Sequence, residues 1–199
     1  LFVTAGLAGI LAVVLFGQNP ESRPAVHFTF DAPENVTLSD LNPLAVSPDG
    51  RVVIFSGRPP AGAWQLWTRT LESAEVRALP GTQGAGQPFW SPDDSSIAFF
   101  AEGELRKLSL ASGKVQTICA LPPGTSLPAG TWNNEGTIVF SIGSVSGLYS
   151  VSAAGGEARL LTTPDEQTHH WWPQFLPDGR RFIFEIYGLE AEKKGVHVA

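Results

Sequence analysis

The sequence predicts an all-β protein: a partial β-propeller of three complete four-stranded blades and an incomplete fourth, preceded by one transmembrane helix. Composition is the first of three observations behind this prediction. The 199 residues include 21 Gly and 16 Pro, no Met and only 16% charged residues, whereas helical bundles are rich in Ala, Leu, Glu and Lys. The others are an uncharged N-terminal run and a turn motif that recurs at regular spacing.

The uncharged run covers residues 1–17. A membrane-spanning helix needs about 20 apolar residues, and a signal peptide would add a basic stretch before the run and a small-x-small cleavage site after it. Neither signal is present, so we expect a transmembrane helix. A signal-peptide core and a buried helix remain the alternatives. Residues 18–38 follow as a juxtamembrane linker, in which residues 26–30 alternate as an entry strand does.

The repeated motif combines a turn with the apolar strand after it. Its acidic residues Asp49, Asp93, Glu135 and Asp178 are 44, 42 and 43 residues apart. Proline presets the backbone of such a turn, an acidic residue caps it, and glycine accepts the left-handed position. The turn residues, for which we expect a structural role, are Pro48, Asp49, Gly50, Pro92, Asp93, Asp94, Glu135, Gly136, Pro177, Asp178 and Gly179.

Each turn is followed by further short strands, which together make one unit of four antiparallel strands. After each turn comes an apolar strand, expected over 51–55, 96–100, 137–141 and 181–186. Second strands are expected over 65–71, 104–110, 147–152 and 195–199, and third strands over 75–79, 114–121 and 157–162. A radial stack of such sheets has a period of about 40–45 residues. We therefore assign residues 39–199 to a partial propeller with blades at about 42–83, 86–127, 129–168 and 171–199.

Aromatic residues recur on the innermost strands: Phe89, Trp90, Trp132 and Phe175. We expect them to pack between blades, because each sheet must bury both faces. The Ser-Pro-Asp-Gly turns resemble those of the TolB-type, WD-repeat-like propellers. The order of segments 26–30, 86–93, 130–133 and 172–182 is more specifically similar to the extracytoplasmic sensor half of membrane-anchored serine/threonine protein kinases of acidobacteria. That resemblance implies a kinase domain before the membrane helix and a propeller outside the cytoplasm.

The motifs of catalysis are missing from the sequence itself. It has no kinase signature set and no Gly-x-Ser-x-Gly nucleophile elbow, and the glycine-rich residues 81–86 open no expected helix. The single cysteine, Cys119, excludes an internal disulfide framework and a multi-cysteine zinc site. A formal net charge of −6 argues against nucleic-acid binding. We expect no catalytic residue, metal or cofactor in this chain.

The most conspicuous side chains are His169, His170, Trp171 and Trp172, placed after Asp165 in what the sequence suggests is a polar loop between blades. Adjacent histidines on a strand point to opposite faces and chelate metal poorly. Packing in the loop and the aromatic core is the favoured interpretation, and a platform for a ligand is the alternative.

Three functions are compatible with these observations. The favoured one is a non-catalytic module, the sensor of a receptor-like kinase, anchored in the cytoplasmic membrane by residues 1–17, with the propeller in the periplasm or outside the cell. An unknown protein or small molecule would bind at the propeller mouth. The alternatives are a membrane-anchored TolB-like scaffold and the propeller half of a prolyl-oligopeptidase-type peptidase.

Overall fold

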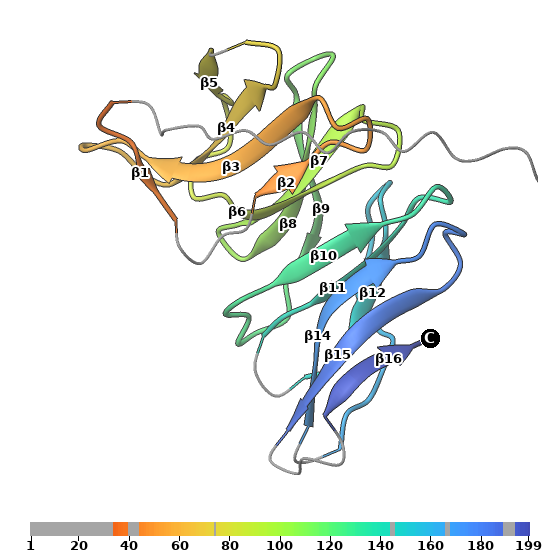
Figure 1. The fold of residues 1–199 in the computed structure, drawn as a ribbon. Coiled ribbons are helices and arrows are strands. Elements are labelled where there is room, and N and C mark those ends of the chain that lie inside the picture. Colours follow the sequence, from red (N-terminus) through yellow and green to blue (C-terminus); the bar gives the residue numbers. More distant parts are fainter. Residues whose placement is uncertain (1–33, 40–43, 74, 144–145, 166–167, 189–193) are drawn as a thin grey trace, which may run out of the picture. The chain divides into compact units, whose positions relative to one another are not determined.

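In the computed structural model, the described residues are 34–39, 44–73, 75–143, 146–165, 168–188 and 194–199. Every regular element within these ranges is a β-strand, and the strands form four successive antiparallel sheets, coloured from orange to blue in Figure 1. The all-β prediction is therefore confirmed for this part of the chain. The predicted transmembrane helix at 1–17 and the predicted strand at 26–30 lie outside the described residues.

The first blade is the sheet β1-β3-β4-β5, with β2 also paired to β3. Its strands are β1 (Thr37–Leu38), β2 (Ala45–Val46), β3 (Val52–Arg58), β4 (Gln65–Thr70) and β5 (Val76–Ala78). Because β1 pairs with the end of β3 and β2 with its beginning, the two short strands together occupy the innermost position of this blade. Residues of the linker predicted at 18–38 thus already belong to the sheet.

The second and third blades each have four strands in sequence order. The second contains β6 (Gly86–Trp90), β7 (Ser96–Ala101), β8 (Glu104–Ser109) and β9 (Val115–Ala120); the third contains β10 (Ala129–Trp132), β11 (Thr137–Ser141), β12 (Tyr149–Ser152) and β13 (Arg159–Leu160). The fourth blade consists of β14 (Thr168–Phe175), β15 (Phe182–Gly188) and β16 (Gly195–Val198).

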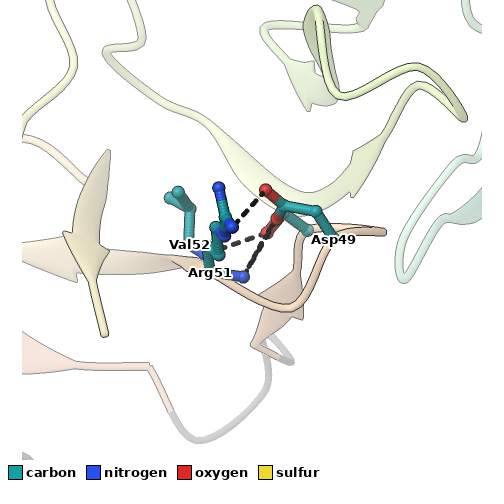
Figure 2. A network of polar contacts seen from close by, with 4 residues as sticks. Asp49, Arg51 and Val52 are labelled. Atoms are coloured by element: carbon teal, nitrogen blue, oxygen red, sulfur yellow. Dashed lines mark hydrogen bonds and ion pairs between the residues drawn. The ribbon is translucent and has the colours of Figure 1, made fainter. Parts of the chain in front are cut away.

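Each innermost strand is connected to the next strand by the predicted acidic turn. In the first blade, the Ser47 hydroxyl donates to Oδ1 of Asp49 at 2.6 Å, and the same oxygen accepts the backbone N–H of Arg51 at 2.9 Å. Figure 2 shows the Asp49 side chain turned back toward Arg51. The turn closes with Gly50 N–H donating to the carbonyl of Ser47, and Gly50 has a φ of 74°, a conformation that glycine adopts at little cost.

The other turns reach the same geometry with different residues. Ser91 and Asp93 repeat the serine–aspartate pair. In the third blade the prediction that the acidic residue caps the turn was wrong, because the acceptor is Asn133 and not Glu135. Oδ1 of Asn133 accepts the backbone N–H groups of Glu135 and Thr137 at 3.1 and 2.8 Å, so this one side chain replaces the serine–aspartate pair. In the fourth, Asp178 accepts two backbone N–H groups and the guanidinium of Arg181, which lower the pKa of its carboxyl to about 2. A short polar side chain that caps the turn backbone is therefore the shared requirement.

The hydrophobic core is divided among the blade junctions. One cluster joins the first and second blades through Ile54, Ile97 and Phe99, another joins the second and third through Phe100 and Phe140, and a smaller one joins the third and fourth through Val139 and Phe184. The aromatic residues of the innermost strands pack on these clusters, as predicted: Phe89 and Trp132 on the second junction, Trp90 in the first and Phe175 on the third.

Candidate functional site

The innermost strands of all four blades border one groove of about 640 Å³. We call it the inner groove. It is bounded by residues of β2, β6, β10 and β14 and by the acidic turns that follow these strands. The innermost strands of a propeller surround its axis, so the groove is the surface that this part of the molecule turns toward the axis.

Aromatic rings and prolines provide the apolar lining of the groove. Phe89, Trp90, Trp132 and Phe175 contribute rings, and Pro48, Pro88, Pro92 and Pro177 contribute the prolines. The Trp90 indole is fixed, since its Nε1 donates to the carbonyl of Ala45 in the first blade at 3.1 Å. A firmly packed ring presents a defined surface to a ligand and loses little entropy on binding.

Two amides, those of Asn134 and Gln174, are the polar side chains best placed to meet a ligand in the groove. Both side chains are exposed and line the groove. The side chain of neighbouring Asn133 already makes hydrogen bonds within the protein. Its Oδ1 accepts from the turn backbone, and its Nδ2 donates to the carbonyl of Gly179 in the fourth blade at 2.8 Å. The hydroxyl of Thr131 also has a partner in the protein, since it accepts the backbone N–H of Phe175. Asn134 and Gln174 each offer a donor and an acceptor.

The sequence analysis assigned the aromatic residues only to the core and did not single out Asn134, Gln174 or Pro88. A signal for these residues was present, because all three stand on or beside an innermost strand in register with the repeated turn. The repeat predicts which strands face the axis, but in these strands period-two alternation is interrupted. Register shifts occur between Gly86 and Phe89 and between Trp171 and Gln174, so the orientation of each side chain required the structure.

Of the predicted turn residues, Pro48, Pro92, Pro177 and Gly179 line the groove. Asp94 departs from the common conformation of the turns. It occupies the position of Gly50 and has a φ of 59°, which a residue with a Cβ adopts only at some cost. Its Oδ1 is buried and has no hydrogen-bond partner in the described part of the chain. Partial desolvation, together with the nearby Asp49 charge, raises the pKa of the Asp94 carboxyl.

The predicted cluster His169, His170, Trp171 and Trp172 does not lie in a loop. It belongs to β14, which begins at Thr168 and pairs with β15 from Thr168 to Trp171. The expectation of a polar inter-blade loop at these positions was therefore wrong. The reason is that β14 is eight residues long and begins before the repeated motif, whereas the innermost strands β6 and β10 have only five and four residues.

Strand geometry separates the two histidines, as the sequence analysis expected of neighbours on a strand. The buried His170 hydrogen-bonds through Nδ1 to the Thr162 hydroxyl at 2.7 Å and packs on Phe184. Burial is the main factor that lowers the pKa of the His170 imidazole, followed by the His197 charge. His169 instead stacks on Trp171, which stacks on Tyr187 with ring planes 7° apart. The four residues thus contribute to two faces of the sheet rather than to one site.

Neither a metal centre nor a membrane span emerges from the described residues. None of the groups of His, Cys, Asp and Glu in these ranges has the arrangement of three or more ligands that a metal ion requires. The described part of the chain contains no helix that is long and apolar enough to cross a bilayer. The buried Cys119 lies in the core of the second junction, and burial raises the pKa of its thiol, which opposes nucleophilic reactivity.

Comparison with known proteins places the fold among the β-propellers. No family model matches the chain. The putative TolB from Agrobacterium tumefaciens superposes with a TM-score of 0.62 at 17% identity, over 77% of this chain and 58% of that one. The propeller domain of the Trilobed protease from Pyrococcus furiosus, described as having an open velcro topology, superposes with a TM-score of 0.57 at 14% identity, over 83% and 55%. The described sheets therefore form part of a propeller, and this propeller is TolB-like.

Sequence comparison adds a relative of a different kind. An uncharacterised peptidase of Bacillus subtilis, YuxL, is 30% identical over 150 residues. The match spans 73% of this chain but 22% of the peptidase. The chain therefore corresponds to about a fifth of that relative and to a little over half of the two propeller structures.

Proposed function

We propose that the chain is a non-catalytic binding propeller, and that the inner groove holds an extended segment of a partner protein. The observation that carries the proposal is the composition of the groove: packed aromatic rings and prolines on its walls, with the exposed amides of Asn134 and Gln174 among them. Aromatic-lined grooves with a few hydrogen-bonding groups are suited to extended peptides, since rings contact the side chains and amides pair with the backbone.

The wider setting is part of the same proposal. Residues 1–17 would anchor the propeller to the cytoplasmic membrane, and the propeller would lie in the periplasm or outside the cell. A kinase domain on the other side of the membrane would make the propeller a sensor. A signal would then require that the partner binds two states of the protein with different affinity.

A direct binding measurement tests the role of the groove. A phage-displayed library of random linear peptides is selected on the immobilised 199-residue chain, and the dissociation constant of each selected peptide is measured by calorimetry. Removing both groove amides, Asn134→Ala with Gln174→Ala, is expected to weaken binding about tenfold, the effect of losing about 1.4 kcal/mol of hydrogen bonding. The matched control is Gln116→Ala, an exposed glutamine on β9 away from the groove.

Two results would overturn this role. One is a selection that yields no peptide with saturable binding. The other is a set of peptides whose affinity is the same for the double variant and for the wild-type chain, which would place the binding surface elsewhere on the molecule.

A second candidate function is favoured by the sequence relative. The 30% identity to part of YuxL, an uncharacterised peptidase, supports the propeller half of a prolyl-oligopeptidase-type peptidase, whose catalytic residues would lie in another domain. Sequencing the gene on both sides of the chain separates the candidates. A kinase catalytic loop and Asp-Phe-Gly segment upstream supports the sensor, a nucleophile elbow downstream supports the peptidase, and neither supports a membrane-anchored TolB-like scaffold.

A further inference from the structure

The walls of the inner groove carry no charge. Every residue that lines it within the described part of the chain is apolar or has a neutral polar side chain, although 16% of the residues in the sequence are charged. A charged side chain placed in the groove would lose water without gaining an opposite charge, which is costly. The part of an occupant that lies in the groove is therefore uncharged.

The free edges of the innermost strands are poorly suited to the addition of another strand. β6 and β14 lie at the edges of their sheets, but Pro88 and Pro173 each remove a backbone N–H, five residues before the acidic residue of the turn. The residues before these prolines, Gln87 and Trp172, have left-handed φ angles of 51° and 46° and lie within register shifts. Prolines and bulges blunt a sheet edge, and the other innermost strands, β2 and β10, have only two and four residues. An occupant that pairs as a β-strand is therefore disfavoured.

A polyproline II segment suits the same groove better. This conformation has no internal hydrogen bonds, so its carbonyls are free to accept from the exposed amides of Asn134 and Gln174. The rings of Phe89, Trp132 and Phe175 stand on the walls, and aromatic-lined grooves are the surfaces on which proline-rich segments dock. Because such a segment is already extended and stiff, it loses little conformational entropy on binding.

Carboxylates are in excess at the end of the groove that the first and second blades form. Pro92 lines the groove there, and Asp93 and Asp94 directly follow it in the chain. Neither makes an ion pair with a residue that the structure describes, and Asp93 is instead held by serine hydroxyls. In the neighbouring turn, Asp49 has Arg51 as its partner at 3.9 Å. The two turns thus bring three carboxylates and one guanidinium to this end.

The opposite end, formed by the third and fourth blades, is balanced in charge. Pro177 lines the groove there, and the two turns carry Glu135 and Asp178 together with Arg180 and Arg181. The guanidinium of Arg181 donates to the Asp178 carboxylate at 2.7 Å. A cationic group on an occupant is therefore favoured at the first end and not at this one.

We propose that the occupant of the inner groove is a proline-rich segment in the polyproline II conformation, and that a basic residue flanks this segment at the end next to Asp93 and Asp94. The inference rests on the proposed function and specifies the chemistry of the ligand. The uncharged walls select the apolar part of the segment, and the charge difference between the two ends of the groove sets its direction.

Calorimetry with synthetic peptides tests both parts of the proposal on the 199-residue chain. The probe is a lysine followed by repeated Pro-Pro-Leu triplets, and a second version carries the lysine at the other end, so that both chain directions are covered. Replacing the prolines by alanine is expected to weaken binding about fivefold or more, because the free alanine peptide has more conformations to lose. Replacing the lysine of the tighter version by glutamate is expected to weaken binding about threefold, and added NaCl should reduce this difference.

A variant of the chain locates the basic residue of the peptide. Asp93→Asn combined with Asp94→Asn removes both charges, while asparagine can still accept the N–H groups of the turn. We expect this variant to bind the lysine and glutamate peptides equally. The matched control Glu157→Gln, at an exposed acidic residue that does not line the groove, should keep the full preference for lysine. Thermal denaturation verifies that both variants are folded.

This inference and the proposed function fail in different ways. If the peptides selected from the random library lose affinity for the Asn134→Ala, Gln174→Ala variant but are not enriched in proline, the role of the groove stands and the inference is overturned. Equal binding of the proline and alanine peptides overturns it too, as does the absence of saturable binding by the lysine-containing probes. A preference for lysine that persists without Asp93 and Asp94 overturns the placement of the basic residue. A library that yields no saturable binder overturns the inference and the proposed function together.

Discussion

The indole Nε1 of Trp90 donates a 3.1 Å hydrogen bond to the carbonyl oxygen of Ala45, which lies 45 positions earlier in the chain. This bond joins the innermost strands of the first two blades, β2 and β6, at the wall of the inner groove. One side chain therefore packs in the core of a junction, satisfies a backbone acceptor of the neighbouring blade and shapes the candidate binding surface.

Replacing this residue tests how much the junction depends on the bond. The variant Trp90→Phe keeps an aromatic ring but loses the donor and some volume, so we expect a loss of about 1–3 kcal/mol in unfolding free energy. Urea denaturation followed by far-UV circular dichroism measures it. The matched control is Trp172→Phe, since Trp172 is 59% exposed and should change the free energy by less than about 0.5 kcal/mol.

Asn133 provides a second test, of the turn and the blade junction together. The variant Asn133→Ala leaves the backbone N–H groups of Glu135 and Thr137 and the carbonyl of Gly179 without their partner. We expect a loss of about 2 kcal/mol or more, because the residue is buried. The adjacent Asn134→Ala, at an exposed position, should leave the same denaturation curve unchanged. Equal effects of the two variants would contradict the role assigned to Asn133.

Asp94 is expected to be a site where substitution stabilises the protein. Glycine tolerates the φ of 59°, so Asp94→Gly should gain about 1 kcal/mol in unfolding free energy at neutral pH. The reverse change in the first blade, Gly50→Asp, should lose a similar amount. Loss of stability in Asp94→Gly would show that the Asp94 carboxylate makes an interaction that outweighs the backbone strain.

Asp94→Asn separates charge from backbone strain, since asparagine keeps the side-chain size and accepts positive φ. The pKa of Asp94 is raised in the folded chain, so its ionised form opposes folding at neutral pH. That penalty disappears as the pH falls below the folded pKa. The stabilising effect of Asp94→Asn should therefore be largest near pH 7 and should shrink in acid, which denaturation curves across this range measure.

Asp178 should make the opposite contribution to the pH dependence. Its folded pKa is about 2, below the ordinary value of 3.8, so ionised Asp178 stabilises the fold above pH 3.8. This contribution is lost as the pH falls toward 2. Asp178→Asn preserves an acceptor for the N–H groups of Arg180 and Arg181, and we expect it to flatten the decline in thermal midpoint between about pH 4 and 2. The exposed Glu157→Gln serves as the control and should leave the decline unchanged.

Much of the fold could be predicted from the sequence because the blade is a local unit. Four acidic turns at a nearly constant spacing, each followed by an apolar strand, are enough to indicate repeated antiparallel sheets, since each turn is closed by residues only a few positions apart. The third turn is capped by Asn133, whereas the first is capped by Ser47 and Asp49. The repeat is still recognisable in the sequence, because both arrangements cap the same backbone groups of the turn.

The sequence by itself determined the all-β class, the repeat and the position of each turn. Only the tertiary structure decided what the side chains between the turns contact. It placed His169 and His170 on a strand rather than in a loop, and it brought Asn134 and Gln174 to one groove. The physical reason is that turns are made by hydrogen bonds between near neighbours, whereas the groove and the junctions are made by residues far apart in the sequence. Trp90 and Ala45, for example, are 45 positions apart, and whether they meet depends on how the blades pack.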